Sequence, residues 1–263
     1  MGHYYSRDGQ PRYFVQAKAG HDRPSTVTDA KKFGWVPSVT EVIGVLDKPA
    51  LTRWLFNNGA KASETHPRKP GEPDEAWFRR LDEEARRPGV ERADEGSILH
   101  DALEHYVSGP QAIAAKWKPH CEATFATLRE RFGDMPWVAE ASFAHPLGFG
   151  GKADLTAPAL VADHKSKPFI DKPAAKYAYD NHVMQLAAYA VGFGLVPHYW
   201  DTPDEWAGVT LANTFVGCQD AKVALHVWTP EEAARGWRMF RHALGIWQEQ
   251  KFDSRFDIEA LAA

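Results

Sequence analysis

Three charged residues, Asp154, Asp163 and Lys165, have the types and the spacing that phosphate chemistry needs. Side chains of a strand alternate between its faces, so Asp163 and Lys165 of the segment ALVADHK share one side. Asp154 lies nine positions before Asp163, across a short turn, and antiparallel pairing would bring the two carboxylates together. Facing carboxylates repel unless a cation lies between them, and Mg²⁺ prefers carboxylate, water and phosphate oxygens. The pattern therefore indicates either a magnesium site whose lysine assists an attacking water, or a surface ion pair on a hairpin.

Residues that flank these charges are suited to complete such a site. The sequence GFGGKAD places Gly148, Gly150 and Gly151 just before Asp154. There, missing side chains allow a nucleic-acid backbone or a neighbouring strand to approach closely, although a tight loop would need the same residues. Glu140, on the preceding predicted strand, would add a third carboxylate.

Two predicted helices carry polar residues that can face the same region. In GSILHDALEHYV, His100 lies about 100° around the helix from Leu99 of the apolar stripe, so it can face a cleft beside the sheet. His100 and His105 lie about 140° apart around the helix, which prevents them from jointly holding one zinc ion. Gln185 and Tyr189 in MQLAAYA share a helix face that is either solvated or suited to hold a base or a phosphate.

The hydrophobic pattern predicts the elements that position these side chains. Apolar residues follow a helical period in the first half, strand alternation in the middle, and helix, strands and helix again towards the end. Helices are expected as two short pieces within 41–60, capped by Ser38 or Thr40, and at 76–86, 96–107, 119–132, 180–195 and from 229 onwards; strands are expected at 137–145, 151–157, 159–165, 208–216 and 222–228. This order predicts an α/β fold with one central mixed sheet flanked by helices and an N-terminal helical elaboration.

The domain organisation follows from the same pattern. We expect one domain over residues 1–263: a mainly helical part at 1–135, a catalytic sheet with its QxxxY helix at 136–228, and a C-terminal helix at 229–263. Residues 1–36 suggest an irregular arm or a short hairpin. Residues 61–95 are rich in charge and contain four prolines, so they predict a surface insertion whose only helix is 76–86.

Composition limits the classes of function. Lys and Arg total 31 against 35 Asp and Glu, a net charge of -4. The protein as a whole therefore does not attract polyanions, and a nucleic acid would have to bind at a local basic patch. Such a patch is suggested by lysines near the acidic residues, and Trp35 and Trp54 are candidates to stack bases. Two cysteines, Cys121 and Cys218, are too few for a disulfide scaffold or a four-cysteine metal site and suit a reducing compartment. The lysines concerned are Lys152, Lys165, Lys167, Lys172 and Lys176.

Taken in order, five features of the sequence resemble the RecB-like branch of the PD-(D/E)xK nuclease superfamily. They are GSILHDALE, Glu140, GGKAD, VADHKSK and QLAAY. In that branch a helix His, a strand Asp, an acidic-x-Lys motif and a QxxxY helix recur in this order. The similarity is strongest to the mitochondrial genome maintenance exonuclease and related phage and bacterial exonucleases, which also have an SVT segment, as in PSVT here. It spans about residues 37–189 and implies a restriction-endonuclease-like core.

The resemblance implies a role for each matching residue. His100, Asp154 and Asp163 would be metal ligands, with the His164 carbonyl as a further one, and Lys165 would be the catalytic lysine acting with the two aspartates. Glu140 would be an acidic helper. The implied cofactor is one or two Mg²⁺ or Mn²⁺ ions, and no iron–sulfur cluster, because the cysteine quartet of the cluster-containing members is missing. The implied DNA-binding residues are Gln185, Tyr189, Ser166, Lys167, Ser38 and Thr40.

The sequence thus predicts a magnesium- or manganese-dependent DNA exonuclease that hydrolyses phosphodiester bonds, on single-stranded DNA or strand ends, in DNA repair, recombination or viral DNA processing. The expected location is the cytoplasm of a bacterial cell, or of a host cell if the protein is viral, with no membrane partner; a recombination or single-strand-binding protein partner is left open. One alternative is a non-catalytic nucleic-acid-binding module with the same fold. A zinc hydrolase that uses some of the 12 histidines is less well supported, because no pair has the usual ligand spacing.

Overall fold

A central mixed sheet organises the molecule. The computed structural model describes residues 2–17, 20–109 and 113–252. Within them, the main sheet has five strands in the order β5–β6–β7–β8–β9, all antiparallel to their neighbours except the parallel pair β7–β8. The predicted α/β class with a central mixed sheet is confirmed. The strands are β5 (Val138–His145), β6 (Phe149–Ala157), β7 (Leu160–Lys167), β8 (Thr210–Gly217) and β9 (Val223–Val227).

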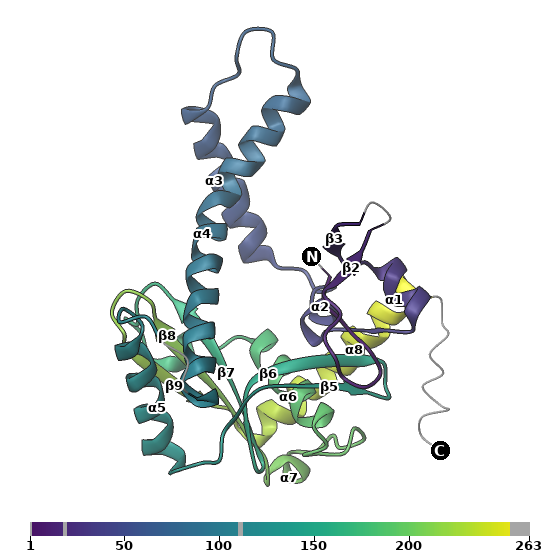
Figure 1. Cartoon of the computed structure of the whole chain (residues 1–263), viewed down its shortest axis with the longest axis vertical. Helices are drawn as coiled ribbons and strands as arrows, with labels where there is room; N and C mark the ends of the chain where they lie inside the picture. The colour runs from purple at the N-terminus through teal and green to yellow at the C-terminus, as the bar shows by residue number, and fades with distance from the viewer. Residues whose placement is uncertain (1, 18–19, 110–112, 253–263) are drawn as a thin grey trace.

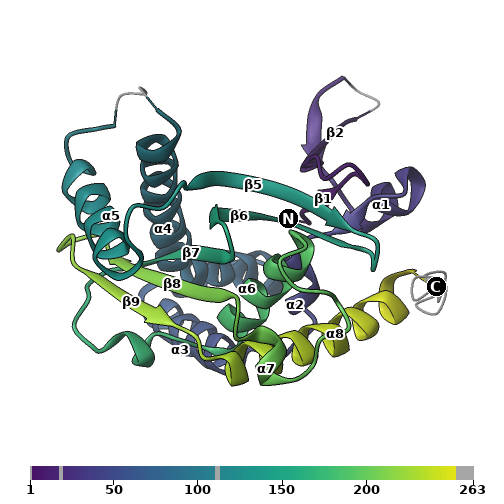
Figure 2. The ribbon, with the colours of Figure 1, turned by 90° about the horizontal axis from the view of Figure 1, so that it is seen from below.

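Helices cover both faces of this sheet (Figure 2). On one face, α4 (Asp74–Ser108) and α5 (Lys118–Phe132) enclose a core that includes Ala162 of β7. On the other face, α6 (Asp180–Gly192) and α8 (Pro230–Phe252) enclose a second core that includes Val161. Because neighbours in β7 serve opposite cores, the following residues alternate in the same way and place Asp163 and Lys165 on the α6 side.

The charged insertion forms a long helical hairpin instead of a mostly irregular loop. Helix α3 (Pro49–Thr65) packs against α4, which runs without interruption through Pro88, and the pair projects from the body (Figure 1). The prediction of a helix limited to 76–86 is therefore wrong. A proline inside a helix costs about 3 kcal/mol. Packing between the two helices offsets that cost, because Trp54 lies on Gly89 and the Asn58 amide donates to the Ala85 carbonyl at 3.3 Å.

The N-terminal part is more ordered than the sequence suggests. A short hairpin is present as predicted, but the residues after it form helix α1 (Val27–Phe33), which was not predicted. Thr26 and Asp29 make a reciprocal capping box there, and Arg23 holds Asp29 with two hydrogen bonds. The hairpin strands are β2 (Phe14–Gln16) and β3 (Asp22–Pro24), and β1 (Tyr4–Tyr5) pairs with β4 (Val36–Pro37).

The remaining short elements connect the layers. Helix α2 (Val39–Ile43) begins at Ser38, whose hydroxyl accepts from the Glu41 amide as a cap, in agreement with the prediction. A 3-10 turn η1 (Ala174–Lys176) precedes α6, and α7 (Pro203–Trp206) precedes β8. Among the described residues, no helix is both long and apolar enough to cross a membrane.

Candidate active site

An ion pair occupies the centre of β7. Asp163 is 2% exposed, and the Lys165 Nζ lies 2.7 Å from its Oδ2. Gln185 of α6 joins the two residues, since its Oε1 accepts from Lys165 at 2.9 Å and its Nε2 donates to Asp163 Oδ1 at 3.1 Å. The same Nε2 donates to the Tyr189 hydroxyl at 2.9 Å. Four residues singled out in the sequence therefore form one connected network between β7 and α6.

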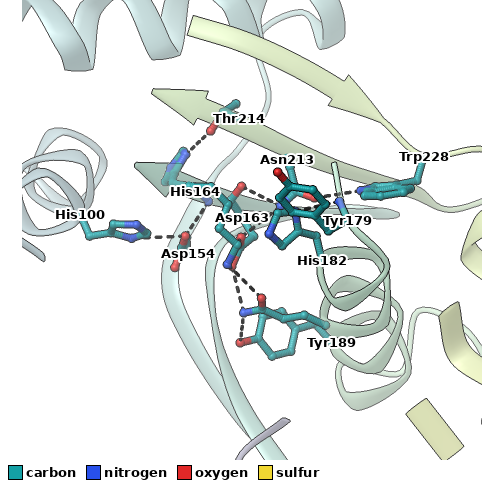
Figure 3. A network of polar contacts seen from close by, with 12 residues as sticks. His100, Asp154, Asp163, His164, Tyr179, His182, Tyr189, Asn213, Thr214 and Trp228 are labelled. Carbon is teal, nitrogen blue, oxygen red and sulfur yellow. Dashed lines mark hydrogen bonds and ion pairs between the residues drawn. The ribbon is translucent and has the colours of Figure 1, made fainter. Parts of the chain in front are cut away.

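Two residues that sequence reasoning missed hold Asp163 from the other side (Figure 3). The Asn213 Nδ2 on β8 donates to Asp163 Oδ2 at 3.1 Å, and Trp228 Nε1 donates to Asn213 Oδ1 at 2.9 Å. An indole N–H can only donate, so Trp228 fixes which end of the Asn213 amide faces the carboxylate. No spacing rule links Asn213 to Asp163, because the parallel β7–β8 pairing that joins them spans 50 positions in the sequence.

Asp154 lies where β6 and β7 separate. The β6–β7 ladder ends at the pair Leu155–Ala162, and the Asp154 Oδ2 accepts instead from the His164 main-chain N–H at 2.6 Å. The same oxygen lies 3.4 Å from Nδ1 of His100 on α4. The structure therefore brings His100, Asp154 and the β7 residues together, as Figure 3 shows.

The His164 imidazole points away from Asp163, as strand alternation requires. Its Nδ1 lies 2.5 Å from the Thr214 hydroxyl, and burial lowers its pKa to about 4. The ring is thus neutral at pH 7, and its Nε2 is buried without a hydrogen-bond partner in the described part of the chain. The main-chain N–H of His164 contacts Asp154, whereas its ring points to the other side of the sheet, and the role expected for its carbonyl stays a prediction.

The charges of the site stabilise one another. Burial raises the pKa of Asp163 to about 6, even though the Lys165 ammonium opposes this. Burial also disfavours charge on Asp154, but its hydrogen bond with His100 holds the pKa of this carboxyl below its usual value. Burial lowers the pKa of His100, and the contact with Asp154 more than compensates, so the net shift is upwards. At neutral pH both aspartates and Lys165 are therefore charged.

A cavity of about 530 Å³ opens beside this network. His100 and Tyr189 line it, whereas Asp154, Asp163 and Lys165 are not among the lining residues. Two of the glycines explain how the wall packs: a Cβ on Gly151 would lie 2.6 Å from the Tyr189 ring, and one on Gly150 would lie 2.9 Å from the Tyr5 side chain. The main-chain oxygen of Phe143 on the neighbouring strand β5 lies closer still to the Cβ position of Gly150, at 2.8 Å, so both a strand and side chains approach there. The other predicted site residues that line the cavity are Ser38, Thr40, Glu140 and Ser166.

Several predicted residues do not reach this cavity. The Lys167 Nζ lies over the rings of Tyr177, Tyr179 and Phe215, at 5.6–5.9 Å from their centroids. Trp54 packs between α3 and α4, and Trp35 stacks on Phe33. Of the five lysines clustered in the sequence, Lys152 alone lines the cavity, where it pairs with Glu140, while Lys172 and Lys176 are exposed elsewhere.

The donor set fits a divalent cation in its chemistry. One imidazole, two carboxylates and a main-chain carbonyl are the oxygen-rich ligands that hard cations such as Mg²⁺ or Mn²⁺ accept. Across residues 2–17, 20–109 and 113–252, however, no three His, Cys, Asp or Glu side chains already converge as a metal site. In addition, Lys165, Gln185 and Asn213 occupy the oxygens of Asp163. Loading a cation onto both aspartates therefore requires Asp163 to exchange one of these partners.

Comparison with known proteins adds little to this geometry. No protein-family model matches the sequence, and no curated protein matches it. A solved structure described as "Crystal structure of SSO0001" is 15% identical, with a match that covers 81% of this chain and 95% of that chain at a TM-score of 0.32. A similarity this low supports no conclusion about chemistry.

Proposed function

We propose that this chain is a metal-dependent DNA exonuclease that hydrolyses phosphodiester bonds of single-stranded DNA or at strand ends, in repair, recombination or viral DNA processing. The observation that carries the proposal is the meeting of groups from α4, β6 and β7 at one point. There Asp154 contacts both His100 and the His164 amide, next to the Asp163–Lys165 pair. The order of these residues in the RecB-like nucleases supports the same reading.

The cation would be held by His100, Asp154 and Asp163, with the His164 carbonyl as a further oxygen. When bound, Mg²⁺ or Mn²⁺ supplies Lewis acidity to a phosphoryl oxygen. The chain's own contribution is the Lys165 ammonium, which can orient the attacking water and offset charge that develops on phosphorus. Gln185 holds that amine in place through its Oε1. Ser38, Thr40 and Tyr189 line the cavity in which the DNA strand would lie.

The direct test is cleavage of labelled single- and double-stranded DNA with Mg²⁺ or Mn²⁺, and again after addition of EDTA. The proposal expects metal-dependent products from wild type and about 10²- to 10⁴-fold slower cleavage by Lys165→Met, which keeps the length of the side chain but removes the amine. Lys222→Met is the matched control, because the Lys222 side chain is 68% exposed and its ion pair with Asp220 is long, at 3.7 Å. Full activity of Lys165→Met would refute the proposed role of this site.

A second candidate function is a non-catalytic nucleic-acid-binding module. It is favoured by one observation, that Asp163 is fully engaged with Lys165, Gln185 and Asn213 and so resembles a structural network. The same assay separates the two functions. A binder would retain DNA with and without EDTA and yield no products with either metal.

We place this activity in the cytoplasm. Cys121 and Cys218 are both buried and unpaired with one another, as suits a reducing compartment. Burial also raises the pKa of each thiol, so little of the reactive thiolate is present at neutral pH.

A further inference from the structure

The N-terminal arm contributes an aromatic wall to the cavity beside the candidate active site. Three of its side chains, His3, Tyr5 and Tyr13, line that cavity. The His3 and Tyr13 rings lie 4.6 Å apart with an interplanar angle of 31°, which is a tilted stack. Tyr5 meets Tyr13 edge-on at 5.9 Å, and the two hydroxyls are 2.8 Å apart. We call these three residues the aromatic wall.

The arm is fixed in place by the segment that supplies the cavity hydroxyls. The Ser38 amide donates to the His3 carbonyl at 2.8 Å, and β1 pairs with β4 just before Ser38. Tyr5 is 3% exposed, and its side chain packs where Gly150 has no Cβ. The wall therefore holds a constant position relative to the hydroxyls of Ser38 and Thr40, which are 3.1 Å apart.

The outer ring of the stack remains accessible. His3 is exposed and Tyr13 is half-buried, so the stack can continue onto a third ring. Although His3 is exposed as a whole residue, partial burial of its ring lowers the pKa, so the imidazole is largely uncharged at neutral pH. A neutral imidazole on a phenol is an aromatic surface suited to a nucleobase, since stacking on aromatic side chains is worth roughly 1–3 kcal/mol per base.

The charges around the cavity argue for a base instead of a run of phosphates at this wall. Three carboxylates line the cavity, those of Asp101, Glu104 and Glu140. Lys152 also lines it, but its ammonium is already paired with Glu140. Carboxylates repel phosphates but accept hydrogen bonds from the amino groups of bases. The cavity volume of about 530 Å³ lies within the roughly 300–1,000 Å³ of pockets that hold one small ligand, and one nucleotide is of this size.

We propose that the aromatic wall stacks the unpaired base of one terminal nucleotide of a single DNA strand and so positions that strand for cleavage. This inference depends on the proposed nuclease function for its consequence, but the stacking itself does not require a cut. It assigns His3 and Tyr13 as substrate-binding residues, which their place in an irregular N-terminal arm did not indicate.

The first test measures stacking without cleavage. A single-stranded oligonucleotide carries 2-aminopurine, whose fluorescence falls on stacking, at its 5′ end or its 3′ end, and is titrated with protein in EDTA. Wild type should quench the probe at one end, and His3→Ala should weaken binding about tenfold. Tyr13→Leu removes the ring on which His3 stacks and should lose most of the quenching. Phe14→Ala is the matched control, because Phe14 is adjacent, 56% exposed and not among the residues that line the cavity.

The second test uses an oligonucleotide with an abasic residue at the terminal position. Wild type should bind it about tenfold more weakly than the intact strand, and His3→Ala should bind both equally. Equal binding of both strands by wild type, or an equal loss in Phe14→Ala and His3→Ala, would overturn the inference. Absence of metal-dependent products together with normal quenching would instead count against the nuclease function and leave the aromatic wall supported.

Discussion

The centre of the sheet and the α3–α4 hairpin both contain oppositely charged residues in contact, but in different surroundings. On the hairpin, Arg86 pairs with Asp82 at 2.8 Å, and both side chains are more than half exposed. In the sheet, Lys165 pairs with Asp163 at 2.7 Å, and the carboxylate side chain is 3% exposed. The distances are nearly the same, so solvent decides what each pair does.

Exposed and buried ion pairs differ in how they contribute to the free energy of unfolding. An exposed pair contributes about 0–1 kcal/mol, because water screens the charges and solvates either partner when the other is lost. A buried pair costs desolvation free energy that its Coulomb attraction barely repays, and it is weak evidence for stability. The hairpin charges therefore keep a projecting element solvated, whereas net stability alone does not account for the buried charges in β7.

The largest expected effect is on stability when the buried pair is broken. Lys165→Met leaves the Asp163 carboxylate buried without its cation, and we expect a loss of about 3–5 kcal/mol in the free energy of unfolding. The double variant Asp163→Asn/Lys165→Met should lose at least about 2 kcal/mol less unfolding free energy than the sum of the losses in the two single variants. Urea unfolding of wild type, the two single variants and the double variant at pH 7.5 measures this coupling. Additive losses would show that the pair does not behave as buried.

The next effect concerns the residues behind Asp163. Asn213→Leu removes the amide that donates to Asp163 and accepts from Trp228, all within the core, so we expect a loss of about 2–3 kcal/mol. Trp228→Phe removes only the indole donor and should cost less, about 1 kcal/mol. If Asn213 positions the carboxylate, both variants should also weaken Mn²⁺ binding, in the same order. A change in stability with unchanged Mn²⁺ binding would make this role structural only.

A smaller effect should appear in acid at the β5 end of the sheet. The His145 Nδ1 accepts from the Leu147 amide at 3.2 Å, and burial lowers the His145 pKa to about 4 from the ordinary 6.5. Between these values the unfolded chain binds more protons, so stability is full above pH 6.5 and falls as the pH drops towards 4, by roughly 2 kcal/mol. His145→Asn retains an acceptor that does not titrate. Its unfolding free energy should decrease less over this range, and an unchanged pH slope would contradict the assignment.

The smallest effect is expected on the hairpin. The coupling between Asp82 and Arg86, measured by a double-mutant cycle with alanine, should be about 0.3–0.5 kcal/mol or less and should decrease with added salt. A coupling as large as that of Asp163 and Lys165 would remove the contrast between the two regions.

Alternation and helix periods predicted what is local. The three-strand meander, the shared face of Asp163 and Lys165, and the four-residue step from Gln185 to Tyr189 all follow from patterns of a few residues. Proline and charge gave a wrong prediction for the hairpin, because the contact of Trp54 with Gly89 that supports the helix through Pro88 joins two separate segments. Local propensity is a weak guide where tertiary packing acts.

Parts of the candidate site could not be predicted for a related reason. Nothing in the sequence around Asn213 indicates a role, because only the register between β7 and β8 places it beside Asp163. His3 and Tyr13 belong to an arm with no sustained period, and only the folded chain brings them to the cavity of His100. Glu140 illustrates a further limit: its backbone has a φ of 54°, which its place in a predicted strand does not indicate.

The central claim, that Asp154 of β6 and Asp163 of β7 serve a divalent cation, is tested most directly by Mn²⁺ binding to the protein without DNA. Electron paramagnetic resonance of free Mn²⁺ counts the ions bound by wild type and by Asp154→Asn, with Asp101→Asn as a carboxylate control on the same cavity. We expect wild type and the control to bind one or two ions and Asp154→Asn to bind at least tenfold more weakly. Equal binding by wild type and Asp154→Asn, or none by wild type, would contradict the account.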